Sequence, residues 1–163
     1  MKLPTKEECL KILEKAEVPA NIIAHTSTVC DFSMKVIDLL EKKGIKVNRN
    51  LVAAAALLHD LKKMASDRHE IDGAEHIKQL GYPEVGRVIS KHGLANLNKE
   101  ELIPKTWEEK ILFYSDKRVN GDKVVTVDER FEYIKQRYKK EGIEKEIEFT
   151  KKIEKELLGN EKI

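Results

Sequence analysis

The chain has 163 residues, of which 40% are hydrophobic and 37% charged, and its 31 basic and 29 acidic residues leave a formal net charge of +2. This length suits one domain with a buried core, and the interspersed charges favour solvated helix faces over a nucleic-acid-binding track, which needs segregated positive charge. The longest apolar stretch, residues 51–58, is too short to span a bilayer, which excludes a membrane-spanning protein.

The first half of the chain predicts helices with recognisable signals at their ends. The N-terminal signals are a capping box of Thr5 with Glu8, Pro19, Asn48 or Asn50, and a capping pair of Asp67 with Glu70. Gly44 and Gly81 stand where glycine commonly ends a helix. The helices are therefore expected at 5–17, 19–44, 48–59 and 67–80.

The second half continues the helical pattern with one exception. A short helix follows Pro83 and stops at Gly93, and Thr106 with Glu109 opens a helix that carries residues 111–116. Residues 124–127 are the only strand-like run. Because four residues cannot build a sheet, we expect an extended connection there.

Two amphipathic helices are predicted near the end of the chain. Asp128 is expected to cap the first, which carries Phe131, Ile134 and Tyr138 on one face. The second covers about 142–158 and places Phe149, Ile153 and Leu157 at a spacing of four residues. The predicted fold class is all-α, a single helical-bundle domain over residues 1–163 with its core at about 5–140.

Several polar side chains fall on helix faces that are otherwise apolar. His59 and Asp60 end the apolar stretch, and three more inward positions are His25, His92 and Asp116. A buried imidazole or carboxylate is costly unless something pairs with it. One such residue is ordinarily hydrogen-bonded to a backbone group, but five together indicate a metal site of the kind that helical bundles build from inward side chains.

The order His25, then His59-Asp60, then Asp116 resembles the H…HD…D pattern of the HD-domain metal-dependent phosphohydrolases. Residues 57–63, LLHDLKK, resemble that family's LLHDIGK segment, with a lysine in place of the glycine. Residues 69–74 resemble its H…GA motif, and residues 81–92 resemble its GY..V…H motif. The resemblance covers about residues 5–140 and implies the helical fold of that family.

The resemblance implies a metal cofactor and its ligands. The four-ligand set of the family corresponds to His25, His59, Asp60 and Asp116. A branch with two further histidines holds a second ion, and those positions are His69 and His92 here, with Asp60 as the bridge. We therefore expect one or two divalent transition-metal ions, and the mixed nitrogen and oxygen donors suit Fe, Mn, Co or Zn.

Three further residues are expected at the substrate. Lys63 matches the family's lysine and is expected to bind substrate phosphate, acting with Asp60 in catalysis. Arg118 follows Asp116 and could add positive charge at the rim of the site. His76 lies seven residues after His69, on the same helix face, and is either an alternative ligand or a histidine near the substrate.

The implied activity is hydrolysis of a nucleotide or another small phosphate ester by a metal-activated water. Two alternatives stay open: an HD-fold di-iron oxygenase with the same ligands, and a non-catalytic module that binds a nucleotide or a protein partner. The start of the chain has no signal-peptide-like run, and Cys9 and Cys30 have no CxxC spacing. A cytoplasmic location with a small phosphorylated substrate is expected, and the oligomeric state is left open.

Overall fold

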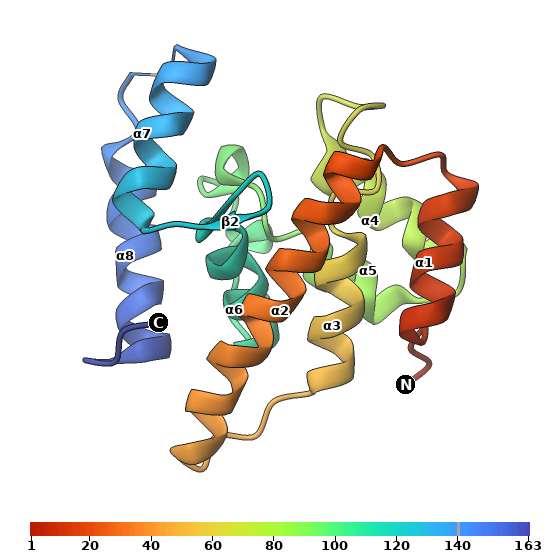
Figure 1. Cartoon of the computed structure of the whole chain (residues 1–163), viewed down its shortest axis with the longest axis horizontal. Helices are drawn as coiled ribbons and strands as arrows, with labels where there is room; N and C mark the ends of the chain where they lie inside the picture. Colours follow the sequence, from red (N-terminus) through yellow and green to blue (C-terminus); the bar gives the residue numbers. More distant parts are fainter. Residues whose placement is uncertain (140) are drawn as a thin grey trace.

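The computed structural model describes residues 1–139 and 141–163, and helices dominate it, which confirms the all-α prediction (Figure 1). The elements in chain order are α1 (Lys6–Lys15), α2 (Ala20–Lys42), α3 (Arg49–Leu58), α4 (His69–Gln79), α5 (Pro83–Ile89), η1 (Leu94–Asn96), η2 (Glu100–Leu102), α6 (Trp107–Asp116), β1 (Val119–Asn120), β2 (Lys123–Val124), α7 (Val127–Tyr138) and α8 (Glu144–Leu158).

The capping boxes predicted from local sequence are present. The hydroxyl of Thr5 accepts from the amide of Glu8, and Thr106 makes the same bond with Glu109, so both boxes open their helices. Of the two asparagines proposed for α3, Asn48 is the cap, and its side chain accepts from the amide of Leu51 at 3.1 Å.

Two other capping predictions are wrong. The first turn of α4 is not capped by Asp67, because the helix starts only at His69 and the carboxylate of Glu70 is buried, where it accepts a hydrogen bond from Asn96. The cap of α7 is Thr126 in place of Asp128, and it forms a capping box with Glu129.

The expected extended connection is a small antiparallel hairpin. Val119 pairs with Val124, and Asn120 pairs with Lys123, around a turn in which Gly121 has a φ of +61°. Val127 already belongs to α7, so the strand-like run at 124–127 is divided between β2 and the next helix. The hairpin is short, but it packs against α2 and brings the carbonyl of Gly121 to that helix.

The long helix α2 crosses the middle of the molecule, between α3 and α6 (Figure 1). The helix α3 is rich in alanine, and Ala54, Ala55 and Ala56 are all buried between α1, α2, α5 and α6. Helices α4 and α5 cross closely at Gly86, where a Cβ atom would lie 2.6 Å from the carbonyl oxygen of Ala74. This packing draws the ends of several helices to one place.

The last two helices form a pair beside α6 (Figure 1). The predicted apolar face of α8 is confirmed: Ile153 and Leu157 are buried, and the ring of Phe149 meets that of Phe113 edge-on at a centroid distance of 5.3 Å. Among the helices that the described residues form, none has the length and hydropathy to cross a membrane.

Candidate metal centre

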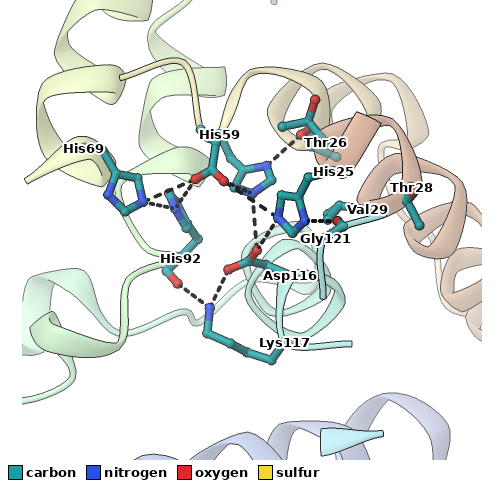
Figure 2. Close-up of polar contacts among 12 residues, drawn as sticks. His25, Thr26, Thr28, Val29, His59, His69, His92, Asp116, Lys117 and Gly121 are labelled. Atoms are coloured by element: carbon teal, nitrogen blue, oxygen red, sulfur yellow. Dashed lines mark hydrogen bonds and ion pairs between the residues drawn. The ribbon is translucent and has the colours of Figure 1, made fainter. Parts of the chain in front are cut away.

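Five segments far apart in the sequence bring histidine and aspartate side chains together (Figure 2). Each contributing position lies on or at the end of a helix that the core holds in place. The residues are His25 on α2, His59 and Asp60 directly after α3, His69 at the start of α4, His92 after α5, and Asp116 at the end of α6. All six side chains that were predicted as metal ligands therefore meet in space.

The more deeply buried group contains His25, His59, Asp60 and Asp116, and one ligand atom from each lies within 4.8 Å of the others. The Oδ1 of Asp116 lies 3.1 Å from Nε2 of His25 and 3.3 Å from Nε2 of His59. The Oδ2 of Asp60 lies 3.7 Å and 3.6 Å from the same two nitrogens. We name these four residues the inner cluster.

A second group contains Asp60, His69 and His92, which we name the outer cluster. Here the other carboxylate oxygen of Asp60, Oδ1, lies 3.2 Å from Nε2 of His69 and 3.7 Å from Nε2 of His92. Asp60 thus presents one oxygen to each cluster, which is the arrangement that a carboxylate bridging two ions requires.

Backbone carbonyls fix the orientation of three of the imidazoles. Nδ1 of His25 lies 2.7 Å from the carbonyl of Gly121, and Nδ1 of His59 lies 2.7 Å from that of Ala56. Nδ1 of His92 lies 2.6 Å from the carbonyl of Ile89. Because a carbonyl only accepts, each Nδ1 carries the hydrogen, and in the neutral ring each Nε2 offers its lone pair to the clusters.

The polar atoms of the clusters are poorly satisfied by one another. His59 is fully buried, yet its Nε2 has no hydrogen-bond partner among the described residues. Nε2 of His92 lies 3.3 Å from Nε2 of His69. In the neutral ring of His92 the hydrogen is on Nδ1, which faces the carbonyl of Ile89, so Nε2 of His92 has no hydrogen to donate to His69. A cation between such donors relieves both defects, so the residues present fit a metal ion.

The electrostatics of the clusters favour bound cations. Burial opposes ionisation of Asp60 and Asp116, but His59 beside the first and Lys117 beside the second hold the pKa of both carboxyls well below their usual range. Burial also opposes protonation of His59, but Asp60 and Asp116 outweigh it and raise the pKa of that imidazole. The field at Nε2 of His59 therefore attracts positive charge.

Lys117 supports the cluster from behind. Its ammonium is buried and donates to Oδ2 of Asp116 at 2.6 Å and to the carbonyl of His92 at 3.1 Å (Figure 2). Burial lowers the pKa of Lys117, and the nearby cations of Arg130 and Lys63 lower it further. The carboxylate of Asp116 acts in the opposite direction. Lys117 thus joins two ligand-bearing segments, and two more cations face the same volume.

A cleft of about 380 Å³ reaches the outer cluster and Asp116. Lys63 lines it, in the turn after α3 where its amide donates to the carbonyl of Asp60, so the expected substrate lysine lies beside the clusters. The cleft is also lined by Arg130, Ile134 and Tyr138 of α7.

Two residues predicted near the substrate lie elsewhere. Arg118 is buried on the other side of α6, where its guanidinium donates to the carbonyl of Val125 and the hydroxyl of Tyr114 and lies over the ring of Phe32. His76 lines a different cavity, between α1 and α4, with Lys15 and Leu80. Neither side chain lines the cleft: Arg118 lies past the end of α6 and is bound by Val125 and Tyr114, and His76 lies about two turns along α4 from His69.

Some residues of the site escaped the sequence reasoning. Glu70 is buried next to His69 and is held by Asn96, whose side chain donates to it at 2.6 Å. The spacing of Arg130, Ile134 and Tyr138 at every fourth residue is a signal for one helix face. Only the packing of α7 shows that this face meets the cleft.

Comparison with known proteins agrees with the geometry. A family model described as HD domain matches residues 22–121, a range that contains all six predicted ligands. A tRNA (cytidine(56)-2'-O)-methyltransferase of Picrophilus torridus is 31% identical over 138 residues, which cover 77% of this chain and 39% of that protein. No solved structure matches the chain.

Two further relatives are more distant. A tRNA (cytidine(56)-2'-O)-methyltransferase of Thermoplasma volcanium is 27% identical over 168 residues, covering 95% of this chain and 47% of that protein. An uncharacterized protein of Methanocaldococcus jannaschii is 29% identical over 136 residues, covering 76% of this chain and 80% of that protein. The chain thus spans less than half the length of the two methyltransferases. Since the family model covers more than half of the chain and includes every residue of both clusters, the chain belongs to the HD domain family.

Proposed function

We propose that the protein is a metal-dependent phosphohydrolase that acts on a nucleotide or another small phosphate ester. The observation that carries the proposal is Asp60, whose two oxygens face the two separate clusters. A carboxylate in this position suits a pair of ions, and paired metal sites are typical of phosphate-ester hydrolysis. Fe, Mn, Co or Zn would suit the mixed imidazole and carboxylate donors.

The charge of the site suits an anionic substrate. With neutral imidazoles, the carboxylates of Asp60 and Asp116 leave a net positive charge once two divalent ions are bound, and Lys63 adds a further cation at the cleft. When bound, such ions supply Lewis acidity toward a phosphoryl oxygen and lower the pKa of a coordinated water. Lys63 would orient the phosphate against this charge.

The residues of the cleft favour water as the nucleophile. No cysteine lines the described part of the cleft. Ser66 does line it, but its hydroxyl donates to the carboxylate of Asp72, which does not belong to either cluster. The chain's own contribution is therefore to bind the ester through Lys63, to hold the ligand side chains rigid, and to keep Asp60 and Asp116 ionised.

The experiment that tests this proposal measures metal content and phosphate release on the same samples. Protein purified without chelator is analysed for metals, and a panel of phosphate esters is assayed with each reconstituted metal. We expect up to two ions per chain and phosphate release. Asp60→Ala should lose both ions and lower activity by about 1000-fold or more, because it removes the shared ligand.

The matched control is His76→Ala, which removes a half-buried histidine outside both clusters and should leave metal content and activity unchanged. Full phosphate release by Asp60→Ala in a metal-replete assay would contradict the mechanism. Oxygen uptake with an organic substrate, lost when Zn replaces Fe, would instead identify the oxygenase alternative.

A second candidate function is suggested by the two relatives named as tRNA methyltransferases. In that case the domain is a non-catalytic module that binds RNA or a nucleotide through the same cleft. It predicts binding of tRNA or a nucleotide with no turnover under any metal. Phosphate release that depends on Asp60 distinguishes the hydrolase from this module.

A further inference from the structure

The face of α7 that lines the cleft has no role in holding the clusters. Arg130, Ile134 and Tyr138 lie at every fourth position of that helix and form one wall of the cleft that Lys63 also lines. The helix follows the range that the family model matches, which ends at residue 121. This wall is therefore a feature that the family assignment does not explain, and its role rests on the function proposed above.

The cations of the cleft differ in what they contact. Lys117 is engaged by Asp116 and the carbonyl of His92. Lys63 and Arg130 form no ion pair with any of the described residues. Nε of Arg130 is buried and has no acceptor among those residues, which is costly for a charged group. The Arg130 guanidinium is thus available to an acceptor that the chain itself does not supply.

The ring of Tyr133 contacts the guanidinium of Arg130 without neutralising its charge. The Cζ atom of Arg130 lies 5.7 Å from the centre of the Tyr133 ring, one turn further along α7, and this contact leaves the edge of the guanidinium for hydrogen bonds. Of the three acids that line the cleft, Glu70 is engaged by Asn96, Asp116 is engaged by Lys117, and Asp67 is exposed.

We infer that Arg130 binds a second anionic group of the substrate, while the phosphate to be cleaved faces the clusters and Lys63. The planar guanidinium can bind two oxygens of a phosphate at once, which a lysine cannot do. Ile134 and Tyr138 continue the same helix face and provide an apolar surface for the part of the substrate between or beside its phosphates. The preferred substrate accordingly carries two phosphates.

Two sources offer this chemistry: the adjacent phosphate of a free nucleoside diphosphate, and the next phosphodiester of an RNA end. The second phosphate is joined to the first through one bridging oxygen in a diphosphate and through a ribose in an RNA end, and the cleft of about 380 Å³ is within the size range of small-ligand pockets. The experiment therefore first measures whether binding of the second phosphate depends on Arg130, and then whether a nucleoside diphosphate or an RNA end supplies that phosphate.

The test is a binding measurement by calorimetry on metal-loaded protein, with inorganic phosphate and with methylenediphosphonate, a diphosphate analogue that hydrolysis cannot cleave. We expect the diphosphonate to bind at least about 10-fold more tightly than phosphate, the gain of one or two charged hydrogen bonds. Arg130→Gln should abolish this preference and leave phosphate affinity unchanged. Lys135→Gln removes the same charge from the same helix, outside the cleft, and should keep the preference.

A preference that survives in Arg130→Gln, or one that is missing in the unaltered protein, overturns the inference. This binding measurement does not depend on turnover. If the preference for the diphosphonate depends on Arg130 but the protein releases no phosphate, the proposed function is wrong and the inference about Arg130 still holds. Adenosine diphosphate and a 5'-phosphorylated dinucleotide then identify the source. If Arg130→Gln weakens the binding of either ligand, the result supports the inference. If both ligands bind Arg130→Gln as tightly as the unaltered protein, the result contradicts it.

Discussion

At the scale of single residues, Lys117 shows how the protein keeps a buried carboxylate in place. Its ammonium bonds both the ligand Asp116 and the backbone of His92. Lys117→Met keeps an unbranched side chain but removes the ammonium, which leaves the buried charge of Asp116 without its lysine partner. In the metal-free protein we expect the free energy of unfolding to fall by about 3 kcal/mol, measured by urea denaturation.

The control for this change is Lys123→Met, at an exposed position of β2, which should alter stability by less than about 0.5 kcal/mol. Metal content gives a second readout, because a displaced Asp116 weakens the inner cluster. Equal stability of the two variants would show that Lys117 does not hold Asp116.

At the scale of elements, Glu109 joins the start of α6 to α5. One carboxylate oxygen accepts from the amides of Lys105 and Thr106, and the other contacts Arg87 and Lys91. Burial alone would raise the pKa of Glu109, but the two amides and Lys91 lower it below the usual value. Its charge therefore stabilises the fold above the ordinary glutamate pKa, and this contribution is lost as the pH falls through the lowered pKa of the folded state.

Glu109→Gln should lower the free energy of unfolding by about 1–3 kcal/mol at neutral pH, and by progressively less as the solution becomes acidic. Urea denaturation over a series of pH values measures the difference. Glu101→Gln, an exposed glutamate before α6, serves as the control and should show no such trend. A penalty of constant size down to the most acidic pH would mean that the charge of Glu109 is not responsible.

The helices also show which features the sequence could predict. Thr106 and Glu109 cap α6 through bonds across three residues, so local sequence was sufficient. Glu70 failed as a capping residue because its partner, Asn96, is 26 positions away. Arg118 lies away from the clusters because its guanidinium is bound by Tyr114 on α6 and by the carbonyl of Val125, and Val125 becomes a neighbour only when the chain turns back after α6.

The site also combines features that the sequence predicts with features that depend on packing. Five of the six ligand positions stand out as polar residues on apolar helix faces, the resemblance to a family adds His69, and the structure brings all six together. The resemblance also implied Asp60 as the bridge, and the structure places one oxygen of its carboxylate toward each cluster. The contribution of α7 to the cleft could not be predicted, because it depends on how that helix packs and no spacing in the sequence contains it.

At the scale of the whole molecule, the clusters connect side chains from five segments of the chain. An ion held by side chains from different helices binds the folded state and not the unfolded one, so it stabilises the fold by mass action. Its contribution is about 2.7 kcal/mol at a free metal concentration of 100 times the Kd. Removal of metal should therefore lower Tm.

The expected shift is measured by thermal unfolding of chelated protein before and after the metal is restored. For a chain of this length, about 2.7 kcal/mol corresponds to a Tm difference of roughly 5–10 °C. Asp60→Ala should show no rise when metal is added, whereas His76→Ala should show the full rise, since His76 lies outside both clusters. An equal rise in Asp60→Ala would show that the stabilising ion does not depend on the carboxylate that the two clusters share, because Asp60 is the one residue common to both.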